Sequence, residues 1–213
     1  MKKYYFVLLI ILVSCSSEFE LKEGDLLFQD LDSSPLCDAI ELVTPGYNEA
    51  NFSHIGLVVL INDTLKILEA IPPKVMLTNL DDFLNRSFDK DGNPKVIVGR
   101  LKDKYLHSVE EAVSYSKSKL NIEYDEFFLM NNNSYYCSEL IYEAFLNDSI
   151  FELKPMTFLH PKTKDTLKVW KDYYKEIEVE IPQNKMGINP GIMSLSNKIE
   201  MVHFYGIPDG LNN

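Results

Sequence analysis

Basic residues are scarce in this 213-residue chain, which has 21 lysines and arginines against 32 aspartates and glutamates and a formal net charge of -11. That balance argues against the cationic surface through which proteins bind nucleic acids or anionic lipid headgroups. The sequence also lacks a glycine-rich phosphate loop, and its four histidines and three cysteines lack the spacing of metal ligands. We therefore expect no nucleic-acid partner, no metal and no cofactor.

Apolar runs long enough to span a bilayer are missing too. The run over residues 4–13 has ten residues, whereas a spanning helix needs about 20. Two lysines precede this run and Leu-Val-Ser-Cys15 ends it, which resembles a bacterial lipoprotein signal. We expect a signal peptide at 1–14, lipid attachment at Cys15, and a tether over 15–23. This would place the protein in the cell envelope, periplasmic or at the cell surface. A plain secretory leader with a chance cysteine is the alternative.

The remaining composition is that of a globular protein, with 46% hydrophobic and 25% charged residues. Neither an internal repeat nor a long linker divides the chain, so we expect a single domain over 24–213. Alternation and helical periodicity predict an α+β fold. The predicted strands are 24–29, 51–61, 65–70, 95–101, 175–181 and 202–205. The predicted helices are 35–43, 78–88, 109–120 and one that starts near Cys137. A capping box at Ser108 and Glu111 would begin the helix over 109–120.

The stretch around Cys137 is a loop that turns into a helix. Leu140, Ile141, Ala144 and Phe145 recur at helical spacing, and Cys137 precedes them on the same face, in the first turn. Unpaired backbone N–H groups and the positive end of the helix dipole favour a thiolate there, and the thiolate is the nucleophile. The alternative is a small buried hydrophobe.

A cysteine nucleophile needs a base and a group that orients the base. His54 lies in an apolar predicted strand. If Asn62 and Asp63 form a two-residue turn, residue numbers in opposed pairs sum to 125, and His54 and Glu69 become diagonal neighbours on one face. A carboxylate there would fix the imidazole tautomer and leave the other nitrogen for Cys137. The alternatives are a satisfied core histidine and a solvent-facing Glu69.

Five stretches, in order and at plausible spacing, resemble the permuted papain-like cysteine amidases (YiiX/YebB-like), a circularly permuted branch of the NlpC-type superfamily. The histidine precedes the cysteine, the reverse of ordinary papain-like enzymes. The matching stretches are Gly24-Asp25-Leu26-Leu27-Phe28-Gln29, Ser53-His54-Ile55-Gly56-Leu57-Val58, Leu68-Glu69-Ala70, Tyr124-Asp125-x-x-Phe128 and Tyr136-Cys137-Ser138-Glu139-Leu140. The resemblance implies a permuted papain-like fold, in which an antiparallel sheet packs against the helix that bears the nucleophile.

The resemblance also implies a reaction and a site. Cys137 would be the nucleophile, His54 the base and then the acid, and Glu69 the orienting residue, and the substrate would be a cell-wall (peptidoglycan) peptide or another small amide. Tyr124 and Asp125 would line the cleft, where Asp125 either holds a substrate ammonium or is a solvated helix end. From its polarity alone, Gln29 is a candidate oxyanion donor.

Two other functions remain open at this point. The same Cys-His site could transfer an acyl group rather than hydrolyse an amide. The protein could also be an inactive binding lipoprotein in which Cys37 and Cys137 form a disulfide, since cysteines pair in oxidising compartments.

Overall fold

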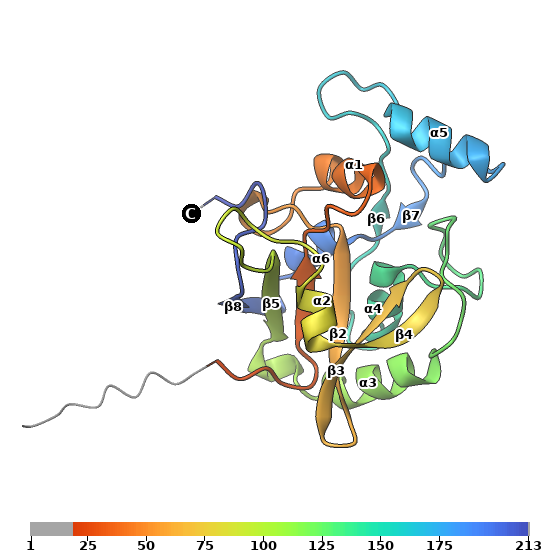
Figure 1. Cartoon of the computed structure of the whole chain (residues 1–213). Helices are drawn as coiled ribbons and strands as arrows, with labels where there is room; N and C mark the ends of the chain where they lie inside the picture. Colours follow the sequence, from red (N-terminus) through yellow and green to blue (C-terminus); the bar gives the residue numbers. More distant parts are fainter. Residues whose placement is uncertain (1–18, 213) are drawn as a thin grey trace, which may run out of the picture.

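The main sheet has six antiparallel strands in the order β4-β3-β2-β1-β5-β8 (Figure 1). The computed structural model describes residues 19–212. The predicted signal peptide and its lipid-attachment residue Cys15 therefore lie outside the described residues. The strands of the sheet are β1 (Leu26–Gln29), β2 (His54–Ile61), β3 (Thr64–Ile71), β4 (Lys74–Asn79), β5 (Val96–Leu101) and β8 (Ile199–Phe204). Two short strands, β6 (Lys154–Pro155) and β7 (Met186–Gly187), pair separately.

The helices cover both faces and one end of the sheet (Figure 1). Their bounds are α1 (Pro35–Val43), α2 (Leu80–Leu84), α3 (Ser108–Ser118), α4 (Cys137–Ala144), α5 (Lys168–Glu176) and α6 (Pro190–Ser194), with 3₁₀ turns at Tyr47–Glu49 and Asp103–Tyr105. Leu140 and Ile141 of α4 pack in one core cluster with Leu57 and Leu68. Phe83 of α2 packs in a second cluster with strand residues that point to the opposite face of the sheet, including Val58 and Ile67. The predicted α+β class and the antiparallel sheet packed against the Cys137 helix are confirmed.

The register of the β2–β3 hairpin is the one that the sequence predicts. Ile61 pairs with Thr64 and Leu57 with Leu68, so paired residue numbers sum to 125. Asn62 and Asp63 have φ values of 47° and 59°, as a type I′ turn requires, and Asn and Asp tolerate that region. The turn therefore decides which side chains of β2 and β3 share a face.

Four details of the predicted secondary structure are wrong. Residues 74–79 form strand β4, which the prediction omitted, and the helix expected over 78–88 is only Leu80–Leu84. Residues 175–181 are not a strand: α5 runs to Glu176, and alternating Ile177, Val179 and Ile181 pack partly buried on an aromatic cluster instead. No capping box begins α3, because Ser108 Oγ donates to Asp148 Oδ2 at 2.6 Å and His107 is the N-cap residue.

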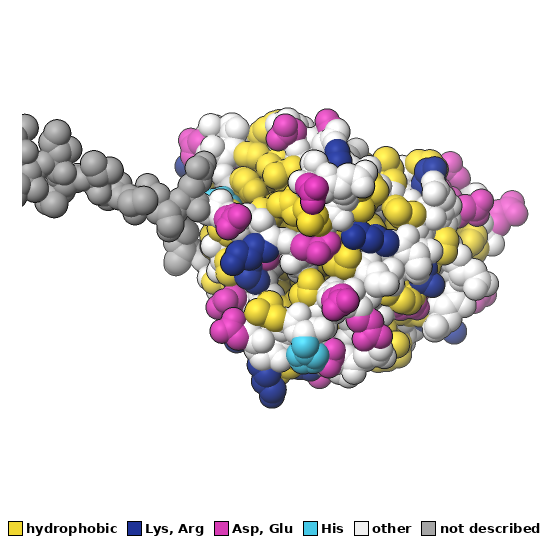
Figure 2. Space-filling model, turned by 90° about the horizontal axis from the view of Figure 1, so that it is seen from below, with side chains coloured by type: hydrophobic (Ala, Val, Ile, Leu, Met, Phe, Trp, Pro, Cys, Tyr) yellow, Lys and Arg dark blue, Asp and Glu magenta, His cyan; other side chains and the backbone are white. Residues whose placement is uncertain are grey.

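The described part of the predicted tether, residues 19–23, packs against the sheet. Phe19 stacks on His203 of β8 with ring centroids 4.1 Å apart, and Arg100 of β5 donates to the Glu20 carbonyl at 3.0 Å. On the face seen from below, acidic and basic side chains are interspersed among apolar ones (Figure 2). Across residues 19–212, no helix combines the length and apolar character that crossing a membrane requires.

Candidate active site

Cys137 is the first residue of α4. Tyr136 before it is extended, so the chain turns into the helix at the cysteine. The apolar stripe of Leu140 and Ile141 is fully buried and leaves the Cys137 side chain 7% exposed beside it. Ser138 Oγ donates to the Ile188 carbonyl at 3.0 Å and ties the first turn to the segment before α6. The thiol thus lies at a helix start, where backbone N–H groups lack partners within the helix.

His54 and Glu69 join β2 to β3 at the point where the backbone pairing ends. The last pair of that ladder is Leu57 with Leu68. Beyond it, His54 Nε2 lies 2.6 Å from Glu69 Oε2, and the two residues are 4% and 0% exposed. Their predicted proximity is confirmed by this contact. Because Nε2 is engaged by the carboxylate, Nδ1 is the ring nitrogen left for Cys137.

Glu69 is surrounded by donors on both oxygens. Arg86 contacts it bidentately, with Nη1–Oε2 and Nη2–Oε1 distances of 2.7 and 2.6 Å, and Thr78 Oγ1 also donates to Oε1. Burial raises the pKa of Glu69, but the hydrogen bonds and charges of Arg86 and His54 outweigh burial and lower it to about 2. The carboxylate is therefore ionised across the neutral range.

The pKa of the His54 imidazole is high for a buried histidine. Burial lowers its pKa, but hydrogen bonds to Cys137 and Glu69, and the negative charges of both, raise it to about 9. His54 is therefore protonated at neutral pH. A protonated imidazole at this position can donate its proton to a leaving group.

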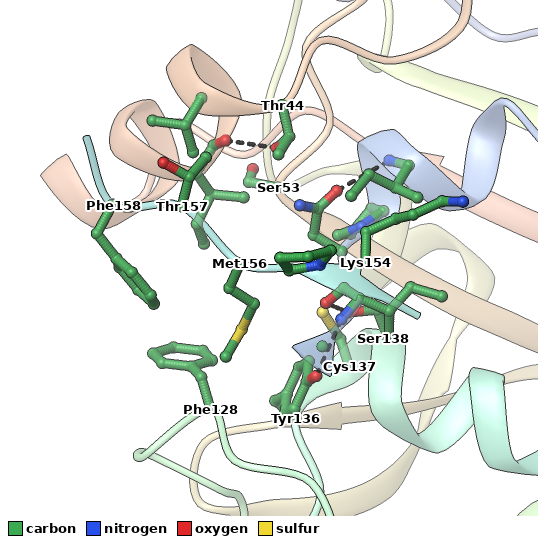
Figure 3. Close-up of a pocket in the computed structure, with 18 of the residues that line it drawn as sticks. Thr44, Ser53, Phe128, Tyr136, Cys137, Ser138, Lys154, Met156, Thr157 and Phe158 are labelled. Atoms are coloured by element: carbon green, nitrogen blue, oxygen red, sulfur yellow. Dashed lines mark hydrogen bonds between the residues drawn. The ribbon is translucent and has the colours of Figure 1, made fainter. Parts of the chain in front are cut away.

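Cys137 lines an apolar cavity of about 90 Å³ (Figure 3). Phe128 and Phe158 lie on one side of the thiol in this view, with the Met156 side chain reaching toward them, and Lys154 lies on the other side. Trp170 adds another aromatic wall. The cavity is smaller than the ~150 Å³ space that accepts benzene in an engineered protein core, so it suits a short aliphatic group.

Tyr124 is the predicted cleft residue that the structure brings to this cavity. Its backbone N–H donates to the Pro73 carbonyl at 3.0 Å, which holds it beside the turn between β3 and β4. Burial and the negative charge of Cys137 raise the pKa of Tyr124 well above 10. The phenol therefore keeps its proton and remains a hydrogen-bond donor.

Asp125 and Gln29 are not brought to the cavity wall. Both oxygens of Asp125 accept backbone N–H bonds, from Phe127 and Leu129 at 2.8 Å each, and the residue is 1% exposed. It shapes the loop rather than facing a substrate ammonium. Gln29 is fully buried and its Nε2 donates to the Phe83 carbonyl at 2.7 Å, so this donor is already engaged away from any developing oxyanion.

Cys37 and Cys137 are both free thiols. Cys37 lies at the start of α1, where its sulfur is 3.5 and 3.6 Å from the hydroxyls of Ser33 and Ser34. The structure therefore contradicts the disulfide on which the inactive binding alternative depended.

Within the part of the chain that the structure describes, one group of acidic side chains is close enough to share a metal ion: Asp30, Asp32 and Asp209. Lys95 Nζ already contacts all three, at 3.1, 2.7 and 3.2 Å respectively. The 2%-exposed lysine supplies the positive charge that these carboxylates balance.

Sequence reasoning missed Arg86, Thr78 and Trp170. Thr78 had a detectable signal, because β4 pairs Met76 with Glu69 and so places Thr78 on the face that Glu69 occupies. Recognising the strand would have revealed this contact. Arg86 lies in the loop after α2, and neither periodicity nor spacing indicates that it reaches Glu69.

Comparisons with known proteins support the fold described above. The crystal structure of the metalloprotein yiiX from Escherichia coli O157:H7 superposes with a TM-score of 0.72 at 20% identity, covering 89% of this chain and 100% of that one. No curated protein matches the sequence. The model of a permuted papain-like amidase enzyme family, YaeF/YiiX (C92), matches residues 20–203. With nearly the whole described chain matched, the protein belongs to this C92 family of permuted papain-like amidases.

Proposed function

We propose that this protein is a cysteine amidase that works through a thioester on Cys137. The observation that carries the proposal is the buried His54–Glu69 pair, joined at 2.6 Å, together with the Cys137 thiol, which raises the pKa of His54 and lines an apolar cavity. Family membership supports cysteine-type amide chemistry in general. Glu69 holds the ring by Nε2, and Arg86 holds Glu69.

The reaction follows from these positions. The Cys137 thiolate attacks the amide carbonyl, and the Tyr124 hydroxyl and the free N–H groups at the start of α4 stabilise the oxyanion. The C–N bond breaks as the His54 imidazolium gives its proton to the leaving amine. Neutral His54 then takes a proton from water, which attacks the thioester and releases the acid.

The cavity favours a substrate whose acyl side is apolar, because its walls near the thiol are aromatic and aliphatic. A cell-wall peptide remains a candidate where an apolar residue provides the carbonyl of the scissile bond. A charged residue at that position would lose its hydration without gaining a partner.

Activated esters test this function directly. We expect p-nitrophenyl isovalerate to acylate Cys137 rapidly, seen as a burst of nitrophenol and a mass increase on the peptide that contains Cys137. The p-nitrophenyl monoester of adipic acid, which carries a carboxylate at the end of its acyl chain, should acylate Cys137 about tenfold or more slowly, since one unpaired charge in an apolar site costs more than about 1.4 kcal/mol. Acylation of Cys137 no faster than that of Cys37 would refute the proposal.

Acyl transfer is the second candidate, and the burial of the thiol favours it. Cys137 is 7% exposed, so a thioester there is partly shielded from bulk water. An amine or alcohol that enters the cavity would then compete with hydrolysis. Product analysis in the presence of added amines separates the two, because transfer gives a new amide and hydrolysis gives the free acid.

We also propose that the mature protein is anchored to a membrane by acyl chains on Cys15, in the cell envelope. The support is the leader sequence, in which the apolar run stops at this cysteine. Bacteria expressing the full chain should incorporate labelled palmitate into the protein, and Cys15→Ser should abolish this labelling and release the protein from the membrane fraction. Equal labelling of Cys15→Ser and the unaltered chain would contradict the anchor.

A further inference from the structure

A second cavity adjoins the thiol cavity and has a different chemical character. It measures about 430 Å³ and is lined by the loop after α4, the end of α6 and the residues before β8. Lys154 and Ile192 belong to the walls of both cavities, so the two are neighbours. Lys198 lines the second cavity but not the first, so the second has two lysines in its wall.

The second cavity is cationic in an acidic protein. Lys154 and Lys198 line it against one acidic residue, Glu152, although acids outnumber bases 32 to 21 in the whole chain. Lys198 Nζ is held by the carbonyls of Ser149 and Asp148 at 2.7 and 3.2 Å. An ammonium has three donors, so one remains after these two bonds, and the same ammonium lies 5.4 Å from the centroid of the Tyr105 ring.

The pair between Lys154 and Glu152 does not block the cavity. Their 2.9 Å contact joins side chains that are 52% and 77% exposed, and such surface pairs contribute about 0–1 kcal/mol. An anionic oxygen that enters the cavity can therefore replace Glu152 at little cost. Lys154 also lies on the opposite side of Cys137 from Phe128 and Phe158 (Figure 3). A substrate with its carbonyl at the thiol would thus extend from the aromatic wall toward the lysines.

We propose that the second cavity binds an anionic group, carboxylate or phosphate, on the leaving amine of the substrate. This inference rests on the proposed amidase function. The acyl group occupies the apolar cavity, the scissile bond lies at Cys137, and the oxygens of the leaving amine bind Lys154 and Lys198. The amine departs with the proton from His54 and carries its anionic group out through the second cavity.

Three amides that share the isovaleryl acyl group test the proposal: isovaleryl-glycine, isovaleryl-phosphoethanolamine and isovaleryl-ethanolamine. The first two carry carboxylate and phosphate, and the third is neutral. We expect kcat/KM about tenfold higher for at least one anionic amide than for the neutral one, as one charge-assisted hydrogen bond would give. The better of the two anions identifies the group bound. Added salt should reduce the preference.

Variants assign the preference to the cavity. Lys154→Met and Lys198→Met should each reduce the ratio of anionic to neutral kcat/KM toward 1. Lys198 also holds two loop carbonyls, so its substitution could disturb the fold. Lys154 is exposed, so its substitution should change the cavity without destabilising the protein. Lys171→Met, on the exposed side of α5, is the matched control and should keep the wild-type ratio.

Equal hydrolysis of all three amides, or a ratio unchanged in both cavity variants, would overturn the inference alone. Failure of all three amides together with failure of the activated esters would overturn the proposed function as well.

Discussion

Replacing Cys137 by alanine is expected to abolish turnover and leave the fold intact. The sulfur supplies the bond to the substrate, so its loss should reduce kcat by about 10⁴-fold or more. The side chain is small and lies at the start of α4, so alanine leaves only a minor cavity. Measurements of hydrolysis and of the thermal unfolding midpoint on the same preparation check both expectations.

Cys37 provides the matched control for this substitution. It is also free and buried, at 9% exposure, but its sulfur contacts only Ser33 and Ser34 among the hydrogen-bonding groups around it. Cys37→Ala should keep wild-type activity. Residual wild-type turnover in Cys137→Ala, or loss of turnover in Cys37→Ala with an unchanged unfolding midpoint, would place the nucleophile elsewhere.

Replacing Glu69 by glutamine should have the second-largest effect. The pKa of His54 is raised to about 9, partly by the charge of Glu69. The imidazolium that protonates the leaving amine is present below this pH and lost above it, so kcat/KM of the wild-type protein should fall above pH 9. Without the carboxylate, the pKa of His54 moves toward its usual value near 6.5. The fall in kcat/KM at alkaline pH, which we call the alkaline limb of the pH profile, should then move to lower pH. In addition, kcat should fall by about 10²-fold.

Glu69→Gln should also weaken the fold in a pH-dependent way. The pKa of Glu69 is lowered to about 2 in the folded protein, against an ordinary value of 4.5. The ionised carboxylate therefore stabilises the fold above pH 4.5, by about 3 kcal/mol, and this contribution is lost as the pH falls toward 2. Urea unfolding of wild type and variant at pH 7 and pH 3 measures it, and the difference between them should be smaller at pH 3.

Asp25 offers a control of the same kind outside the site. It is 1% exposed and contacts Arg100 at 2.7 Å, a buried carboxylate–guanidinium pair like that of Glu69 and Arg86. Asp25→Asn should lower stability and leave the alkaline limb in place. If both variants shift the limb equally, the effect is structural and Glu69 does not orient His54.

The sequence predicts the centre of the fold and the main contact of the site because both depend on local patterns. The turn at Asn62 and Asp63 decides the register of β2 and β3, and the register brings His54 to Glu69. The periodicity of Leu140 and Ile141 similarly predicts α4. These signals each lie within about ten residues.

Elements that depend on distant partners were predicted less well. Ile177, Val179 and Ile181 alternate as in a strand, but the aromatic cluster of α5 provides their packing and no strand lies beside them. The polarity of Gln29 suggested an oxyanion donor, yet the Phe83 carbonyl, 54 positions away, already binds it. Arg86 reaches Glu69 only because α2 folds onto the face opposite α4. Such contacts require the tertiary structure.

The order of β2, β3 and α4 along the chain bears on how the protein matures. The β2–β3 hairpin that carries His54 and Glu69 closes over a two-residue turn, whereas α4 joins it from much farther along the chain, and local contacts form faster than distant ones. The hairpin can therefore pair His54 with Glu69 before α4 brings Cys137 to the sheet. Under the proposed function, the docking of α4 would complete the catalytic site, so a partly folded chain would lack amidase activity.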